Sequence, residues 1–385
     1  MAGVNLSPED VKKGLVVRQV NGVNGKVYRV IVTSNTHDSL ADGVPLLLAQ
    51  QKEGIWRWSV STPKILGDIS GVELAVTGQY QELDKMQENF DTYASDWAFN
   101  WSVPTPPLRP SKDRFDFRAP DYAINLGRKF ESLPQIHHLI WGAYFVLPEW
   151  LKNGDYSRDE LARIIQNHVR TVVSRYNGKV AIWSVVNESL GDPSNPSFWQ
   201  DKLAGSDWIA LAFNTAHDAD PNANLILNDY GIEFAGDPKG DVILSLVRDL
   251  KGKGVPINGI GFQMHLWAAD FAIEENLNSK IGSLVQNIKR FEEIGVDVHI
   301  TELDVDMQEV KGGPQQRLKL QAEIYNRITR AAIQAGVKHI TIFGVRDSQS
   351  WLLSFYGHNN AIPLLIDDNG NFKPAYYSFM SALVD

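Results

Sequence analysis

Eight short β-type runs alternate with helical segments from about residue 67 to the end of the chain, and this alternation is the strongest constraint on the fold. Several runs are largely apolar, as expected of strands that helices cover on both faces. Segments 159–175 and 317–335 have apolar residues at helical spacing. The pattern predicts an α/β protein, a closed (β/α)8 TIM barrel. The eight runs span residues 72–78, 93–101, 136–141, 180–188, 224–231, 259–266, 296–305 and 339–345.

An open, doubly wound sheet is the alternative, but such sheets usually have a glycine-rich phosphate loop after the first strand. Residues 76–80, Val-Thr-Gly-Gln-Tyr, do not form one. The segment before the barrel has a different character, with β-type runs separated by turns rich in Asn, Gly and Asp. We therefore predict two domains, a small β-rich appendage over residues 1–66 and a catalytic barrel over residues 67–385.

Charge and composition exclude several classes of function. Lys and Arg number 37 against 46 Asp and Glu, a net charge of −9, whereas nucleic-acid backbones are bound by a surplus of basic residues. The chain has no Cys, which excludes disulfides and thiolate chemistry. No apolar run approaches the ~20 residues of a membrane helix. The first ten residues contain no apolar leader segment, so we expect a cytoplasmic protein if Met1 is the native start and an extracellular one if a leader was removed.

Two glutamates follow predicted strands on opposite sides of the barrel. Glu188 ends the fourth run, and Glu302 lies near the end of the seventh. Catalytic groups of such barrels lie at the carboxyl ends of the strands, so these side chains can face each other across the mouth. A facing carboxylate pair can hydrolyse a glycosidic bond, one group as a proton donor and the other as a nucleophile or base. The alternative is a structural role for either residue, as a helix cap or the partner of an arginine.

These residues belong to an ordered set of segments that resembles family 10 glycoside hydrolases, the xylanase barrels. Trp183-Ser-Val-Val-Asn-Glu188 is similar to the family's W-D-V-V-N-E motif, and Ile300-Thr-Glu-Leu-Asp-Val305 matches its nucleophile motif. Each segment alone is weak, whereas the set, in order and at compatible spacing from about residue 67 onward, is specific. The remaining segments are 137–141, 147–150, 228–230, 259–266, 344–351 and 373–376.

The resemblance implies roles for individual residues. Glu188 would be the general acid/base and Glu302 the nucleophile of a retaining mechanism. Asn187 would bind the 2-hydroxyl of the attacked sugar, and His265, oriented by Asp304, would hydrogen-bond Glu302. The implied substrate-binding residues are His137, Trp141, Gln263, Trp351, Asn100, Asp96, Phe343 and Tyr230.

The sequence departs from the family around the sugar next to the attacked one. The second-strand motif E-N-x-x-K-W is Asp96-Trp-Ala-Phe-Asn-Trp101 here, so Asp96, Trp97 and Asn100 replace its Glu, Asn and Lys. Phe343 replaces a Trp and has no indole N–H. We infer retained chemistry with altered sugar selection.

The first interpretation is a retaining endo-β-1,4-xylanase-like hydrolase that cleaves xylan or a related plant polysaccharide. The second is an exo-acting or differently specific β-glycosidase that releases short oligosaccharides, and the third is a non-catalytic, carbohydrate-binding barrel. We expect no metal and no cofactor, since the histidines have no zinc-site spacing and no phosphate or dinucleotide motif occurs. The expected partner is a polysaccharide or oligosaccharide, with no nucleic acid and no membrane; Trp56 and Trp58 could form a sugar platform or pack the appendage against the barrel.

Overall fold

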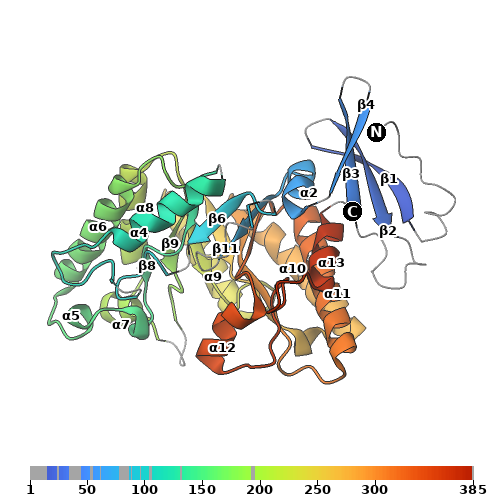
Figure 1. The fold of residues 1–385 in the computed structure, drawn as a ribbon. Helices are drawn as coiled ribbons and strands as arrows, with labels where there is room; N and C mark the ends of the chain where they lie inside the picture. Colours follow the sequence, from blue (N-terminus) through green and yellow to red (C-terminus); the bar gives the residue numbers. More distant parts are fainter. Residues whose placement is uncertain are drawn as a thin grey trace.

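The predicted barrel is confirmed. The computed structural model describes residues 15–23, 26–33, 45–52, 55–60, 62–77, 86–87, 89–95, 97–103, 106–130, 132–191 and 196–383. Within them, parallel strands pair in the order β5–β6–β7–β9–β10–β11–β13–β14 and return to β5, which closes a ring of eight (Figure 1). The strands of this sheet are β5 (Glu73–Val76), β6 (Thr92–Ser95), β7 (Gln135–Ile136), β8 (Ile140–Trp141), β9 (Ile182–Asn187), β10 (Asn224–Asp229), β11 (Gly259–Phe262), β12 (His265–Trp267), β13 (Asp297–Asp306) and β14 (His339–Ile342).

The second and third strands differ from their predicted spans. β6 ends at Ser95, and the chain then turns inward, so that the indole N–H of Trp101 donates to the carbonyl of Leu139 at 2.8 Å. The third run is divided into β7 and β8, both of which pair with β9. The second-strand motif therefore lies on a loop beyond the strand, because its aromatic residues pack against the neighbouring barrel unit.

Helices connect the strands and cover the outside of the ring (Figure 1). The predicted helical stripes at 159–175 and 317–335 coincide with α6 and α11. α6 begins with a capping box, in which the Ser157 side chain accepts from the Glu160 amide and the Glu160 side chain accepts from the Ser157 amide. The α-helices are α2 (Pro63–Ser70), α4 (Arg118–Gly127), α5 (Glu149–Lys152), α6 (Arg158–Arg175), α7 (Phe198–Leu203), α8 (Asp207–Ala219), α9 (Pro238–Gly252), α10 (Glu274–Glu292), α11 (Pro314–Gln334), α12 (Trp351–Tyr356) and α13 (Pro374–Ala382). Among the described residues, no helix is both long and apolar enough to cross a membrane.

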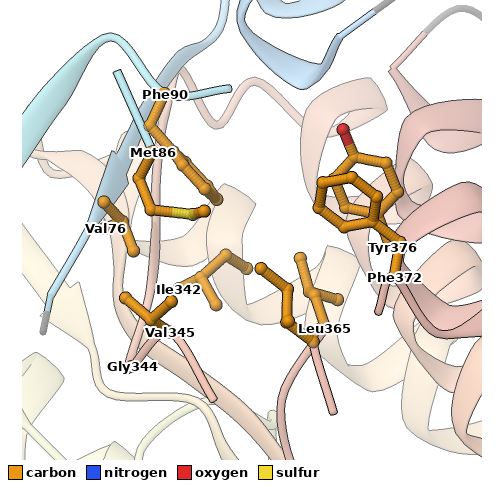
Figure 2. A pocket seen from close by; sticks show the side chains of 10 residues that line it. Val76, Met86, Phe90, Ile342, Gly344, Val345, Leu365, Phe372 and Tyr376 are labelled. Atoms are coloured by element: carbon orange, nitrogen blue, oxygen red, sulfur yellow. The ribbon is translucent and has the colours of Figure 1, made fainter. Parts of the chain in front are cut away.

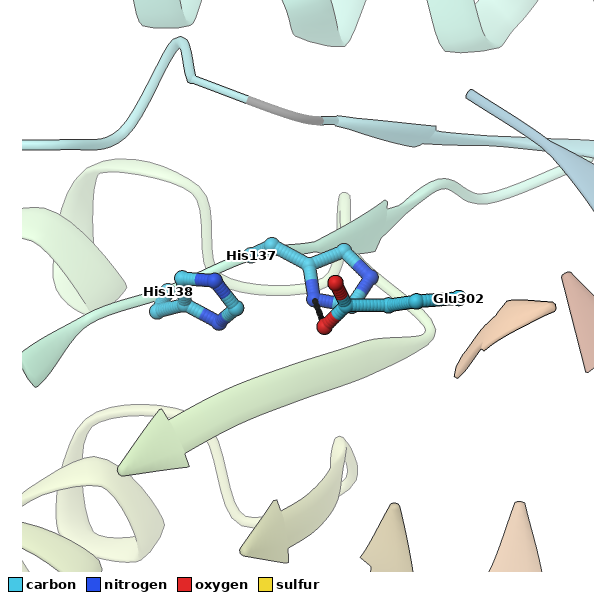
Figure 3. A group of neighbouring side chains, drawn as sticks. All are labelled: His137, His138 and Glu302. Carbon is cyan, nitrogen blue, oxygen red and sulfur yellow. Dashed lines mark ion pairs between the residues drawn. The ribbon is translucent and has the colours of Figure 1, made fainter. Parts of the chain in front are cut away.

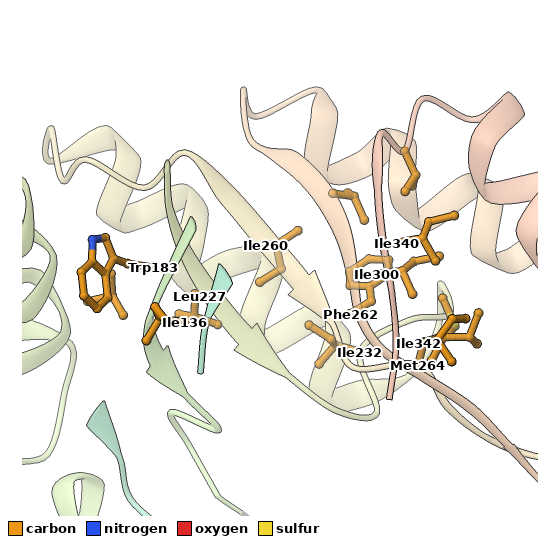
Figure 4. Close-up of a cluster of buried hydrophobic side chains, with 14 of the residues drawn as sticks. Ile136, Trp183, Leu227, Ile232, Ile260, Phe262, Met264, Ile300, Ile340 and Ile342 are labelled. Carbon is orange, nitrogen blue, oxygen red and sulfur yellow. The ribbon is translucent and has the colours of Figure 1, made fainter. Parts of the chain in front are cut away.

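Apolar side chains from the strands and helices form one buried cluster (Figure 4). Trp183, Phe262 and Ile300 are fully buried in it. A polar group completes the closure between the last and first strands, where Nδ1 of His339 lies 3.0 Å from Oε2 of Glu73 and its Nε2 lies 2.7 Å from Oε1 of Gln135. The barrel is thus a packed core, and its chemistry is confined to the rim.

The segment before the barrel forms a four-stranded antiparallel sheet in the order β1–β2–β3–β4. The sequence predicts β runs at 26–33, 44–50 and 55–60, which correspond to β2, β3 and β4, whereas β1 is a strand that the sequence pattern did not indicate. The sheet lies beside α2 and α13 (Figure 1). α2 crosses residues 66 and 67, so the division between the appendage and the barrel at that point stays a proposal. The strands are β1 (Leu15–Asn21), β2 (Val27–Thr33), β3 (Pro45–Lys52) and β4 (Ile55–Val60).

An apolar pocket lies between β5, β14 and the segment that leads into α13 (Figure 2). Its lining includes Val76, Phe90, Ile342 and the stacked rings of Phe372 and Tyr376. Because apolar side chains dominate the lining, we assign this pocket no chemistry.

Candidate active site

The two glutamates lie on opposite sides of the ring. Glu188 directly follows β9, and Glu302 lies within β13, which continues for four residues beyond it and ends at Asp306. Both are almost completely buried, with exposed fractions of 7% and 5%. Glu188 has a φ of +51°, and its amide donates to the carbonyl of Asn228 at 2.9 Å. This left-handed backbone, uncommon for a residue other than glycine, turns the chain at the end of β9.

A bridge of side-chain amides connects the two carboxylates. Nδ2 of Asn228, on β10, donates to Oε1 of Glu302 at 2.7 Å and to Oδ1 of Asn187 at 2.8 Å. Nδ2 of Asn187 in turn approaches Oε1 of Glu188 at 3.2 Å, and Nε2 of Gln263 lies 3.2 Å from the same oxygen. The bridge fixes both carboxylates relative to one another, because it connects side chains from β9, β10 and β13 of a closed barrel.

Asn228 depends on a glycine of the next strand. A Cβ atom on Gly261, in β11, would lie only 2.2 Å from Oδ1 of Asn228 and 2.8 Å from Cγ2 of Thr301. The hydroxyl of Thr301 donates to that same Oδ1 at 2.6 Å, which orients the amide so that its N–H groups point to Asn187 and Glu302. Any larger residue at position 261 would displace the amide bridge.

Glu302 is stabilised as an anion by a chain of three side chains. Nε2 of His265 lies 3.3 Å from Oε2 of Glu302, and Nδ1 of His265 lies 3.0 Å from Oδ1 of Asp304. The indole N–H of Trp351 donates to the other oxygen of Asp304 at 2.8 Å. Burial alone lowers the pKa of His265, but the charge of Asp304 and the hydrogen bonds to both carboxylates raise it to about 10. Burial raises the pKa of Glu302, but the hydrogen bond from His265 and nearby imidazole charge lower it to about 2.

Glu188 is stabilised as a neutral acid. Burial, followed by the charge of Asp229, raises the pKa of Glu188 to about 7, although hydrogen bonds from Trp141 and Gln263 act in the opposite direction. The indole N–H of Trp141 donates to Oε2 of Glu188 at 2.8 Å. Asp229 is buried and lies 2.6 Å from Nζ of Lys239. The two carboxylates therefore have pKa values on opposite sides of the ordinary range, an arrangement that gives each a different protonation state near neutral pH.

The raised pKa of Glu188 predicts a stability cost at high pH. Between pH 4.5 and about 7, Glu188 is ionised in the unfolded chain but remains protonated in the folded protein. The free energy of unfolding therefore decreases as the pH rises through that window. We expect the stability of Glu188→Gln relative to the unmodified protein to increase by up to about 3 kcal/mol from pH 4 to pH 8. Urea titrations at both pH values measure the change, and a constant difference would contradict the raised pKa.

His137 and His138 meet Glu302 and form the one group of potential metal ligands found in the described part of the chain (Figure 3). One ligand atom from each of the three residues lies within 4.8 Å of the other two. Nδ1 of His137 is 3.8 Å from Oε1 of Glu302, and Nδ1 of His138 is 3.3 Å from the hydroxyl of Ser184. Burial lowers the pKa of both histidines, that of His138 to about 3. Among the residues that the structure describes, neither ring nitrogen of the buried His137 has a hydrogen-bond partner.

Aromatic rings surround the carboxylates. Trp351 is half-buried, with its ring 4.7 Å from that of His265, and the ring of Phe343 lies 5.4 Å from the same imidazole. Trp97, from the loop after β6, packs against Trp141 at 5.8 Å. Flat, partly exposed rings are suited to the apolar C–H faces of sugars.

The other predicted substrate-binding residues are more dispersed. Asn100 is buried, and its side-chain oxygen accepts from the Ser102 amide at 3.4 Å. Tyr230 faces Lys239, whose Nζ lies 3.4 Å from the ring centroid. Asp96 lies outside the described residues.

Sequence reasoning missed three residues that contact this network, namely Asn228, Asp229 and Trp97. The first two stand in the segment Asn228-Asp-Tyr230, which was recognised as a motif, although only Tyr230 was assigned a role there. The sequence position of Asn228 and Asp229 could have identified them, because polar residues at the carboxyl end of a predicted barrel strand are candidate active-site residues. For Trp97, the sequence indicates only that an indole replaces the Asn side chain of the family motif.

Two buried carboxylates of opposite acidity at the carboxyl ends of barrel strands are typical of a retaining or inverting glycoside hydrolase. The sequence model of Glycosyl hydrolase family 10 matches residues 70–382. The chain belongs to this family, which confirms the resemblance inferred from the ordered segments.

Relatives and solved structures of this family resemble most of the chain. It is 34% identical over 304 residues to endo-1,4-beta-xylanase B of Thermotoga neapolitana, which covers 78% of this chain and 82% of the relative. It is 36% identical over 273 residues to an endo-1,4-beta-xylanase of Agaricus bisporus, covering 69% and 76%. Xylanase 10B of Thermotoga petrophila, solved in complex with xylobiose, superimposes with a TM-score of 0.74 at 28% identity, covering 84% of this chain and 98% of that one.

Proposed function

We propose that this protein is a retaining endo-β-1,4-xylanase-like hydrolase that cleaves xylan or a related polysaccharide. The observation on which this proposal rests is the pair of buried carboxylates, Glu188 with a pKa near 7 and Glu302 with a pKa near 2, connected by one amide bridge. The relatives named endo-1,4-beta-xylanase and the xylobiose complex of a structural neighbour support a β-1,4-linked xylose polymer as the substrate.

The reaction proceeds in two displacements. Glu302, ionised, attacks the anomeric carbon while Glu188, protonated, donates its proton to the leaving glycosidic oxygen. The bond between the anomeric carbon and that oxygen breaks, and a glycosyl ester to Glu302 forms. Glu188, now ionised, removes a proton from water, which attacks the same carbon and releases the sugar with its original configuration.

Neighbouring side chains prepare the two groups for these steps. The imidazolium of His265, oriented by Asp304, favours the carboxylate of Glu302 before attack and after release. Asn187, already in the amide bridge, binds the 2-hydroxyl of the attacked sugar, a contact that strengthens as positive charge develops on the ring. His137, whose Nδ1 lies 3.8 Å from Oε1 of Glu302, is the side chain placed to bind a further hydroxyl of that sugar.

A second function, an exo-acting or differently specific β-glycosidase that releases short oligosaccharides, is favoured by Trp97. This indole stands where the family has an amide and packs on Trp141 beside Glu188. A bulky ring there fills space that a sugar hydroxyl and its amide partner would otherwise share. The third reading, a non-catalytic barrel, is disfavoured because Glu188, Glu302 and His265 are all present and connected.

The test is a panel of purified polysaccharides and aryl glycosides with product analysis over time. Early mixed-length products from linear xylan support internal cleavage, whereas a single short product from the start supports end-wise release. Activity on mixed-linkage glucan but not on xylan would show that the substrate is a glucose polymer and would contradict the proposed xylose polymer. Binding without turnover on every substrate would support the non-catalytic barrel instead.

The pH dependence follows from the same two groups. Since Glu188 must be protonated and Glu302 ionised, we expect kcat/KM to be bell-shaped, with an alkaline limb near pH 7 and an acidic limb toward pH 2, where global unfolding also intervenes. Asp229→Asn removes a negative charge that raises the pKa of Glu188, so its alkaline limb should move to lower pH. An unchanged alkaline limb in Asp229→Asn would contradict the assignment of that limb to Glu188.

A further inference from the structure

We propose that Phe145 and Phe355 form a barrier at the barrel mouth that limits the sugar chain to a short segment on one side of the cleavage point. This inference rests on the proposed glycosidase chemistry of Glu188 and Glu302, and it favours the second proposed function, end-wise release of short products, over internal cleavage of xylan. It concerns an aromatic bar, defined as the four rings of Trp141, Phe145, Phe355 and Trp351. Neither phenylalanine belongs to a segment that the family resemblance assigned a role.

The bar is continuous. The ring centroids are 5.4 Å apart between Trp141 and Phe145, 5.6 Å between Phe145 and Phe355, and 5.9 Å between Phe355 and Trp351. Both end residues of the bar hydrogen-bond to the active site: the indole N–H of Trp141 donates to Glu188, and that of Trp351 donates to Asp304. The two phenylalanines in its middle remain exposed, at 49% and 57%. Half-exposed large apolar rings that meet from separate segments of the chain indicate a surface shaped for a ligand.

The order of the strands fixes where the bar lies. Phe145 follows β8, which pairs with the Glu188 strand β9, and Phe355 belongs to α12, which follows β14, the neighbour of the Glu302 strand β13. Only β5 and β6 remain between β14 and β7 on that side of the ring. The contact between Phe145 and Phe355 therefore runs alongside the line from Glu188 to Glu302, on the side of β5 and β6.

A substrate must cross that line. The two carboxylates flank the scissile bond, so the sugar chain extends from the pair toward β5 and β6 in one direction and toward β10 and β11 in the other. The first arm meets the bar. A sugar between the two phenylalanines would need an aromatic contact of about 3.5–4.0 Å on each face, roughly 7–8 Å in all. The observed 5.6 Å between the rings leaves no passage there.

Trp97 adds a further aromatic ring on the same side of the two glutamates. It comes from the loop after β6, on the same side as the bar, and its ring lies 5.8 Å from that of Trp141. Five aromatic side chains thus form a connected series on the β5–β6 side of the two glutamates. The preferred substrates are consequently short xylo-oligosaccharides or chain ends, with few units on this arm.

The experiment measures kcat/KM on end-labelled, linear β-1,4-xylo-oligosaccharides of increasing length for the unmodified protein, Phe145→Ala and Phe355→Ala. The matched control is Tyr122→Ala, which removes a 48% exposed ring on α4 that is outside the bar. We expect the unmodified protein to cut at a fixed short distance from one end. Phe355→Ala should raise kcat/KM on long chains relative to short ones by about tenfold, within the range by which a single pocket group discriminates substrates, and should produce longer products.

The outcomes separate the barrier from the proposed function. Unchanged length dependence in both variants overturns the barrier, and so does a fall in relative kcat/KM on long chains, since the rings would then be stacking supports. The same length profile change in Tyr122→Ala would also overturn it. If the unmodified protein cleaves none of the oligosaccharides, the proposed function fails, and with it the barrier; if it cleaves them with no length preference, only the barrier fails.

Discussion

Glu302→Ala is expected to lower kcat by at least about 10⁴-fold on every substrate, a loss typical of residues that act together in covalent catalysis. The reason is that no other described carboxylate is held at the position of Glu302, which receives hydrogen bonds from Asn228 and His265. Steady-state rates on an aryl xyloside and on xylan measure the loss. Azide, a small anion, should restore part of the activity on the aryl substrate by occupying the vacated space and attacking the anomeric carbon.

The product of azide rescue is the decisive readout. If Glu302 is the nucleophile, attack by azide in its place should give a glycosyl azide of inverted configuration, which nuclear magnetic resonance detects. Glu292→Ala, which removes an exposed carboxylate at the end of α10, is the matched control and should retain full activity. Rescue that yields only the free sugar, or substantial activity of Glu302→Ala without azide, would assign the nucleophile elsewhere.

Glu188→Ala is expected to discriminate between substrates according to the leaving group. Polymeric xylan needs a proton on its departing oxygen, so its cleavage should fall by roughly 10²–10⁴-fold, the usual contribution of general acid catalysis. An aryl glycoside with an acidic phenol leaves without that proton, and its first step should be nearly preserved. Hydrolysis of the glycosyl ester then becomes slow, because no base activates water, so a burst of phenol precedes a slow steady state.

The pH profile supplies an independent check on Glu188. The alkaline limb near pH 7 should disappear from the first step of Glu188→Ala on the aryl substrate, since the titrating group is absent. Azide should shorten the lifetime of the intermediate and give a product of retained configuration. Equal losses for Glu188→Ala and Glu302→Ala on all substrates would refute the division of roles between them.

The sequence predicted the barrel and the two glutamates because both depend on local signals. Strand and helix periodicity is local, and the carboxyl ends of barrel strands converge whatever the connecting loops do, so Glu188 and Glu302 could be selected from single segments. Asn228 could not be recognised as a site residue from its own segment. Its role depends on contacts of its side-chain amide with Asn187 on β9 and with Thr301 and Glu302 on β13, which only the folded barrel brings together. The short β6 was missed for a similar reason: Trp101 turns inward to contact Leu139, a partner from the next barrel unit.

Contacts between rim loops were beyond prediction. Phe145 and Phe355 follow strands that are not adjacent in the ring, and nothing in either segment indicates that their rings meet at 5.6 Å. The pKa difference between Glu188 and Glu302 was expected in kind, but its cause needed coordinates, since burial and Asp229 raise one value while His265 lowers the other.

The pairing of β14 with β5 has a consequence for synthesis on the ribosome. Glu73 and His339, which meet where the first and last strands close the ring, are 266 positions apart in the chain. At about 5–20 residues per second, the free edge of β5 waits some tens of seconds for its partner strand to be translated. The nascent chain therefore carries an unpaired strand edge for most of its elongation, and pairing of that edge with another chain would lead to aggregation.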